Sequence, residues 1–233
     1  MNYSLIERIA EECNVDSHRF RKILKDILLE LQNVDVQRLE LLGRSIELYS
    51  NNVRTTSRLK LAFGCIEGKP SIVLITSCEF AKRASTAFRG VQDMFIGFTN
   101  NEVIVSQASG NPMMKITLNN REISKDIALP FVSALLVSSI ITLACLDNSG
   151  KLHVYTVFDV PHTLSSAELG IERCREAASQ ILSLALLASA LIIASHRIAE
   201  NDELRKCMTE KIIYLTNELG RNIYKRMSFV YHT

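Results

Sequence analysis

Asp159 and His162 are the residues in this sequence whose types and spacing could transfer a proton. A carboxylate close to an imidazole can orient it as a general base. Both residues, however, follow a predicted strand directly, where Asp and His side chains commonly bond to loop backbone groups. None of the motifs GxSxG, GxGxxG, HExxH or the P-loop occurs in the chain. The sequence therefore predicts a protein that is not an enzyme.

The cysteines and histidines are scattered along the chain and form no CxxC pair or other metal-ligand spacing. The chain also begins without a secretory leader pattern. We therefore expect reduced thiols that pack as small apolar residues in a cytoplasmic protein, with no metal and no cofactor. The residues are Cys13, Cys65, Cys78, Cys145, Cys174 and Cys207, with His18, His153, His162, His196 and His232.

Residues 4–31 resemble a bacterial helix-turn-helix, which is a DNA-binding motif. Ala10 stands where the two helices would touch, and Asn14, where glycine is usual, stands at a turn position that tolerates a left-handed backbone. The second helix would present a basic face to phosphates. Alternatively, both helices simply pack on the rest of the protein, since the net charge of +2 gives no broad basic surface. The candidate DNA-binding residues are His18, Arg19, Arg21, Lys22 and Lys25.

The 233 residues contain only nine glycines and four prolines, and these are unevenly placed. All four prolines and six of the glycines lie between residues 64 and 161, whereas the flanks are almost free of helix breakers. A turn-rich centre between two breaker-poor ends indicates short strands in the middle and long helices at both ends. The predicted fold class is therefore α+β.

Hydrophobic periodicity and turn residues predict the individual elements. Asp16 is the expected N-cap of a helix whose apolar residues repeat at helical spacing from Phe20 to Leu31. A further helix is expected at the C-terminus, beginning at Asn201 or Asp202. The other predicted helices cover residues 35–50, part of 79–93 and 165–198, and the predicted strands cover 59–65, 71–75, 94–98, 103–105, 116–118, 140–146 and 152–158.

Two windows, residues 127–146 and 177–196, contain no Asp, Glu, Lys or Arg and are long enough to span a bilayer. The first contains Pro130 and runs into a turn at residues 147–150, which favours a short helix, a buried strand and a hairpin. The second is apolar nearly all round, which is typical of a helix buried in a core or an interface as well as of a membrane span. Membrane association therefore stays open as one alternative.

Residues 139–198 resemble the closing half of a GAF domain, with a strand, the turn Asp147-Asn148-Ser149-Gly150-Lys151, a second strand and a long apolar helix. Residues 106–116, with the small-residue-Gly-x-Pro segment, are similar to the part of that family that precedes a short strand. The resemblance covers about residues 35–198. It implies an antiparallel sheet of five to six strands flanked by helices, with helical extensions at residues 1–34 and 199–233. The family signatures for cyclic nucleotides, for a bilin or for methionine sulfoxide reduction are absent.

The resemblance also implies a small-molecule site between one sheet face and residues 79–118. Arg89 would be the partner of an anionic group, because its planar guanidinium pairs carboxylate or phosphate. The alternative is that the apolar candidates pack the core and that Arg89 is solvated. The candidate ligand-binding residues are Phe80, Phe88, Arg89, Met94, Phe95, Phe98 and Met113.

An apolar stripe runs along the C-terminal helix from Leu204 to Met227 and requires a covering partner. That partner is either the preceding long helix or a second copy of the chain. We therefore expect a regulatory GAF-like module that binds a small ligand or a protein partner and signals through terminal, dimerising helices. The alternatives are a transcriptional regulator that reads DNA with residues 4–31 and a membrane-associated protein.

Overall fold

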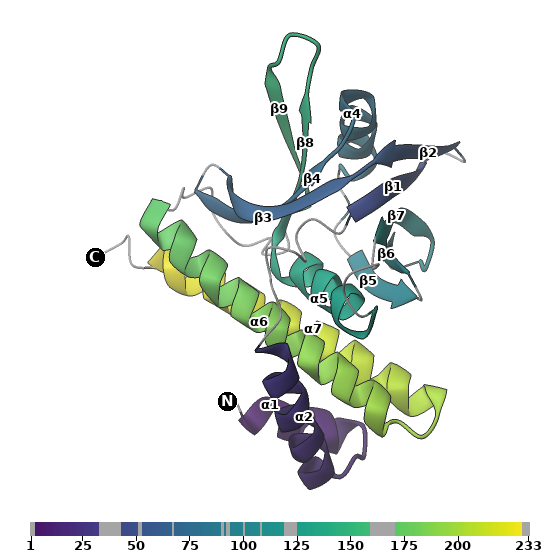
Figure 1. The fold of residues 1–233 in the computed structure, drawn as a ribbon, viewed down its shortest axis with the longest axis vertical. Helices are drawn as coiled ribbons and strands as arrows, with labels where there is room; N and C mark the ends of the chain where they lie inside the picture. The colour runs from purple at the N-terminus through teal and green to yellow at the C-terminus, as the bar shows by residue number, and fades with distance from the viewer. Residues whose placement is uncertain are drawn as a thin grey trace.

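A computed structural model of the chain describes residues 3–32, 43–50, 53–66, 68–89, 91, 94–99, 101–107, 109–118, 125–158 and 171–229. Within these ranges the protein contains six helices and nine strands, which confirms the α+β class (Figure 1). The helices are α1 (Tyr3–Glu12), α2 (Ser17–Leu31), α4 (Cys78–Ala87), α5 (Lys125–Ser138), α6 (Ile171–Ile198) and α7 (Asp202–Phe229).

The larger sheet is antiparallel and has the strand order β2-β1-β7-β6-β5. One face is apolar and buried, with Ile46 and Ile116 directly opposite each other across β1 and β7. The next pair along these strands, Glu47 and Lys115, points to the other face because side chains alternate along a strand. The strands are β1 (Gly43–Ser50), β2 (Val53–Arg58), β5 (Met94–Thr99), β6 (Glu102–Gln107) and β7 (Pro112–Leu118).

The smaller sheet has the order β3-β4-β8-β9 and is mixed, because β4 and β8 run parallel. It consists of β3 (Lys60–Ile66), β4 (Lys69–Ile75), β8 (Ile140–Leu146) and β9 (Leu152–Phe158). The predicted hairpins over residues 59–75 and 140–158 are confirmed, and the β8–β9 hairpin projects from the body of the protein (Figure 1). The single sheet of five to six strands that we expected is wrong, since the strands divide into two sheets.

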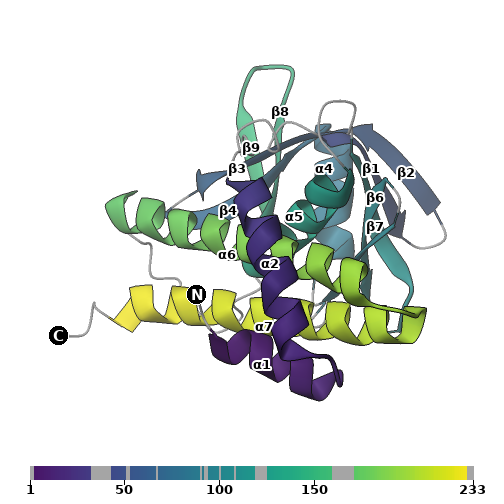
Figure 2. The same ribbon diagram turned by 60° about the horizontal axis from the view of Figure 1, so that its bottom comes forward.

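The two long helices α6 and α7 lie side by side, and α2 packs across α6 (Figure 2). The apolar stripe of α7 is buried against this helical layer: Met208, Ile212 and Leu215 are each less than 5% exposed. Helix α7 contacts α6, α5 and α1 of the same chain. One continuous apolar core runs from α1 to α7. The preceding long helix is therefore the partner that the stripe required.

Both uncharged windows are accounted for by contacts within the chain. The window at residues 127–146 divides into α5 and β8, as predicted. Helix α6 is the described helix that is long and apolar enough to cross a membrane, with a mean hydropathy of 2.1 over its most apolar stretch. Of that stretch, 61% is buried inside the protein, against elements that include α2, α5 and α7. Burial in the core thus explains the absence of charge.

The helix predicted over residues 35–50 is wrong for the described part of that segment. Residues 43–50 form β1, in which Ile46 and Leu48 face the core and Glu47 points to the opposite face. Leu39, Leu42 and Ile46 have helical spacing in the sequence, but pairing with both β2 and β7 selects the strand at Gly43–Ser50. Tertiary pairing overrides a short periodic pattern here.

All six cysteines form disulfides, so the expectation of reduced thiols is wrong. The bonds are Cys13–Cys207, Cys65–Cys174 and Cys78–Cys145, with Cα–Cα distances of 6.0, 6.1 and 5.1 Å. The paired residues are 194, 109 and 67 positions apart, which is why the spacing in the sequence gives no sign of them. They connect α7 to the end of α1, β3 to α6, and α4 to β8. The cytoplasmic location remains a prediction.

Candidate functional site

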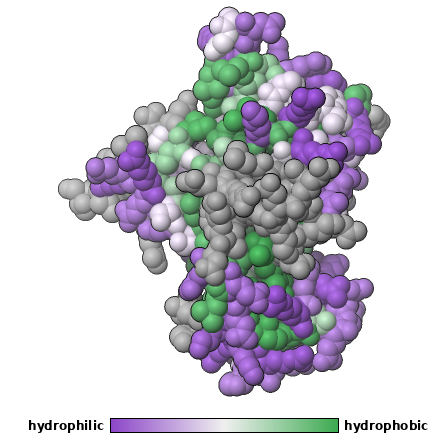
Figure 3. Space-filling model, in the orientation of Figure 1, coloured by the Kyte–Doolittle hydropathy of each residue, from purple (hydrophilic) through white to green (hydrophobic). Residues whose placement is uncertain are grey.

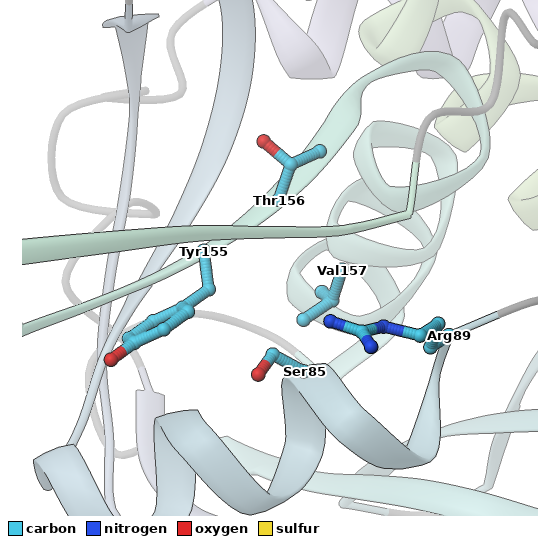
Figure 4. Close-up of a pocket in the computed structure, with 5 residues that line it drawn as sticks. All are labelled: Ser85, Arg89, Tyr155, Thr156 and Val157. Carbon is cyan, nitrogen blue, oxygen red and sulfur yellow. The ribbon is translucent and has the colours of Figure 1, made fainter.

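A pocket of about 290 Å³ lies between the C-terminal end of α4 and strand β9 (Figure 4). Ser85 and Arg89 come from the helix side, and Tyr155, Thr156 and Val157 come from the strand. Figure 4 shows Tyr155 and Val157 on the side of β9 that faces α4, whereas the side chain of Thr156 points to the other side. Thr156 therefore borders the pocket with its backbone.

Local interactions at both ends of α4 fix the position of Arg89. The helix begins at Ser77, whose hydroxyl accepts a hydrogen bond from the N–H of Phe80 at 3.3 Å. At the other end Phe88 is only 3% exposed, and its N–H donates to the carbonyl of Ala84 at 2.9 Å. The buried Phe88 ring anchors the chain, so that Arg89 follows on the exposed side of the helix end.

The guanidinium of Arg89 provides the positive charge of this pocket. It extends between β9 and α4 below Val157 (Figure 4). Among the described residues, no carboxylate forms an ion pair with it. The Ser85 hydroxyl already donates to the carbonyl of Lys82 at 2.8 Å. A guanidinium is suited to pair with a small carboxylate or phosphate group.

The seven candidate ligand-binding residues do not gather at one site. Arg89 lines the pocket, whereas Phe80, Phe88 and Met113 are buried in the core at 5% exposure or less. Met94 and Phe98 pack at the edge of the core, and the ring of Phe98 stacks on His196 of α6 at a centroid distance of 5.7 Å. Phe95 points to solvent with 59% exposure. The strand residues of the pocket were missed because nothing in the sequence brings β9 next to α4.

A second group of charged residues lies on the outer face of the larger sheet. Glu47 accepts hydrogen bonds from Arg54 and from the Tyr49 hydroxyl, the latter at 2.7 Å, and Lys115 pairs with Glu102 at 2.6 Å. The Arg54 guanidinium lowers the pKa of Glu47, and the bond to Glu47 raises the pKa of Tyr49. Since these charges already satisfy one another, the group reads as a structural network.

The N-terminal helices have the turn that the helix-turn-helix comparison predicts. Asn14 has a φ of 54°, and Ala10 is buried at 2% exposure. Two of the five candidate DNA contacts are in ion pairs, Arg21 with Glu7 and Arg19 with Glu200, the latter pair at 3.6 Å. The other three candidates, His18, Lys22 and Lys25, are exposed on α2.

In the described parts of the chain, no three His, Cys, Asp or Glu side chains gather where they could hold a metal ion. The pair Asp159 and His162 lies outside the described residues. No family model, no curated protein and no solved structure matches this chain, so its function must be inferred from the geometry alone.

Proposed function

We propose that this protein is a non-enzymatic, GAF-like regulatory module that binds a small anionic ligand in the pocket between α4 and β9. The observation that carries the proposal is the Arg89 guanidinium, which extends into the pocket without a carboxylate partner among the described residues. A volume of about 290 Å³ suits a small molecule. We infer a compound that carries a phosphate or carboxylate group.

The proposed signal would pass from the pocket to the helical layer through covalent and packed contacts. The first residue of α4, Cys78, is bonded to Cys145 of β8, and β8 pairs with β4. Both β3 and β4 contact α6, which in turn contacts α2 and α7. A ligand that shifts α4 against β9 would therefore bias the position of this helical layer.

The test is a titration with inorganic phosphate and with acetate, followed through the amide resonances of Ser85 and Thr156. Replacing Arg89 with Ala removes a charge-assisted bidentate contact, so we expect affinity for phosphate to fall by about 10- to 100-fold. The matched control is Arg83→Ala, because Arg83 lies on α4, which ends just before Arg89, is exposed, and pairs with Glu79 outside the pocket.

Arg83→Ala should bind phosphate as the wild type does. An equal loss of phosphate affinity in Arg89→Ala and Arg83→Ala would indicate nonspecific attraction and would contradict the proposal. Amide resonances of the wild type that do not change at millimolar phosphate would also contradict it.

DNA binding is the second candidate function, and the left-handed Asn14 between α1 and α2 favours it. A titration with duplex DNA distinguishes anion binding from DNA binding. Bound DNA would shift the α2 resonances around Lys22 and Lys25, and its affinity would fall steeply with salt. A small anion would shift the residues of the pocket instead.

A further inference from the structure

The three disulfides differ in how well a molecule in solution can reach them. Cys65 is exposed on β3, which is an edge strand of the smaller sheet, and its partner Cys174 on α6 is fully buried. Each of the other two disulfides joins a residue at 8% exposure or less to a residue that is only partly exposed. Attack by a thiolate on a disulfide requires access to one of its sulfur atoms. The sulfur of Cys65 is therefore the one that a thiol in solution reaches most easily.

Besides the bond to β3, the first turns of α6 have little apolar packing. Cys174 and Ala177 form a small cluster of their own, against which Ile223 of α7 packs. Among the described residues, the main core includes no residue of α6 before Ile181. Cysteine and alanine have short side chains that bury little apolar surface, so packing alone holds this end of α6 weakly.

The outer side of the same turns is polar. Glu172, Arg175 and Glu176 are exposed. Figure 3 shows hydrophilic residues at the left of the molecule, where the N-terminal end of α6 lies in Figure 1. These turns can therefore move away from β3 without exposing a large apolar surface to water.

We propose that Cys65–Cys174 is a reversible redox switch, in which a small thiol attacks Cys65 and releases the first turns of α6 from β3. The thiolate of the small molecule forms a new S–S bond with Sγ of Cys65. The bond between Cys65 and Cys174 breaks, and Cys174 leaves as a thiolate that takes a proton from water. In the reverse reaction the Cys174 thiolate attacks Sγ of Cys65 and expels the small thiolate, so closing the switch requires no further oxidant.

The position of the bond limits the change to one end of the helical layer. Helix α6 remains in the main core from Ile181 onward. Opening the bond would thus free residues 172–180 and leave the rest of the fold in place. These residues lie beside the last turns of α7 (Figure 2), so the switch would change the surface that the two helix ends form together.

The first experiment treats the native full chain with reduced glutathione at neutral pH. Free thiols are alkylated at successive times, and mass spectrometry locates both modifications. We expect glutathione on Cys65 and the alkyl group on Cys174, formed about tenfold faster or more than any product at the other four cysteines. Removal of free glutathione from a sample that was not alkylated should restore the Cys65–Cys174 bond.

The second experiment follows amide hydrogen exchange in the same reaction. The amides of residues 172–180 should exchange about tenfold faster or more once the bond opens, because little packing holds them. The amides of residues 181–198 should keep their protection, since that part of α6 lies in the core.

Two double variants separate this bond from the others. Cys65→Ser/Cys174→Ser should show the fast exchange of residues 172–180 without glutathione. The matched control, Cys13→Ser/Cys207→Ser, also lacks one disulfide, and its residues 172–180 should exchange slowly until glutathione is added. Circular dichroism melts establish that both variants are folded, and the wild-type reaction tests the proposal even where a variant does not fold.

Four outcomes would overturn the proposal. They are a first glutathione adduct on a cysteine other than Cys65, simultaneous loss of all three disulfides, no reaction at millimolar glutathione, and opening of Cys65–Cys174 without faster exchange of residues 172–180. None of them bears on phosphate binding by Arg89, which is measured separately.

Discussion

Asp147 organises the turn of the projecting hairpin with a single carboxylate. One of its oxygens accepts from the Ser149 hydroxyl at 2.6 Å and from the N–H groups of Ser149 and Lys151 at 2.9 and 3.0 Å. The other oxygen contacts Nε2 of His153 at 2.8 Å. The Ser149 hydroxyl, followed by His153 and the N–H of Lys151, holds the pKa of Asp147 well below its usual range. The ionised carboxylate thus closes the turn between Leu146 and Leu152.

A pH-dependent contribution to stability follows from this lowered pKa. A carboxylate whose pKa is lower in the folded state stabilises the fold above the unfolded pKa, near 3.9, and loses this effect as pH falls. The free energy of unfolding of Asp147→Ala should therefore lie below that of wild type at pH 7, with the difference shrinking below about pH 4. Denaturant unfolding at a series of pH values measures it.

Ser149→Ala serves as the companion variant, because it removes the hydroxyl that contributes most to the lowered pKa of Asp147. Its Asp147 carboxyl should titrate at a higher pH than that of wild type in carbon NMR. A difference between wild type and Asp147→Ala that stays constant from pH 7 to pH 2 would contradict the assignment.

Single residues with strong chemical character could be predicted from the sequence, but their neighbours could not. Arg89 was a candidate because its guanidinium can pair with an anionic group, and it does line a pocket. The apolar candidates around it, such as Phe80 and Phe88, are buried because core packing and ligand binding require the same residue types. Nothing in the sequence marked Tyr155 as a candidate, because it lines the pocket only where α4 packs against β9.

At the level of elements, Gly220 lies where α7 packs tightly against the end of α5. A Cβ atom at this position would lie 3.1 Å from Cα and 3.3 Å from the carbonyl oxygen of Ser138, the last residue of α5. Ser138 is fully buried, and its hydroxyl donates to the carbonyl of Ala134 at 2.6 Å. Glycine is poor for a helix interior, so its presence in α7 reflects this contact.

Gly220→Ala should destabilise the protein although alanine is the better helix former. The gain in helix propensity is about 1 kcal/mol, whereas forcing extra atoms into a packed contact costs about 1–3 kcal/mol. We expect a net loss of about 1 kcal/mol in the free energy of unfolding. Gly64→Ala is the control, since a Cβ there meets no atom within 4 Å. An increase in stability for Gly220→Ala would show that α5 and α7 can shift by the few tenths of an ångström that the Cβ requires.

Elements with marked turns or long periodicity could be predicted, and elements defined by pairing could not. Helix α2 follows from its apolar repeat and from Asp16, whose side chain accepts from the N–H groups of His18 and Arg19. Strand β2 was missed because its sequence, VRTTSR, is polar. Its β-branched Val53, Thr55 and Thr56 after two asparagines were the signal that could have identified it.

At the scale of the whole molecule, the disulfides connect elements that are far apart in the sequence. Cys13–Cys207 joins the end of α1 to α7, next to an ion pair of Lys211 with Glu12. Closing a loop of this length restricts the unfolded chain and so stabilises the fold. Such pairings could not be predicted from spacing, because the sheets and helices alone bring the cysteines together.

Reduction should lower the stability of the protein substantially. For the 194-residue separation of Cys13 and Cys207, loop-closure entropy corresponds to about 5 kcal/mol, and measured effects of disulfides are typically 2–4 kcal/mol. Denaturant unfolding of Cys13→Ser/Cys207→Ser against wild type tests this, with wild type in reductant as the second comparison.

The disulfide assignment itself is checked by alkylating the denatured chain. Mass spectrometry should show no modified cysteine before reduction and six after it. Free thiols in the unreduced protein, or unfolding curves that are indifferent to reductant, would contradict the pairing.

Cys13–Cys207 also makes most of the polypeptide a covalent ring. A protease that cuts the backbone once between these two residues opens the ring but releases no fragment. The nicked protein would keep the mass of the intact one, apart from one added water, until the disulfides are reduced. On a gel it would appear as a single full-length band without reductant and as two bands with it.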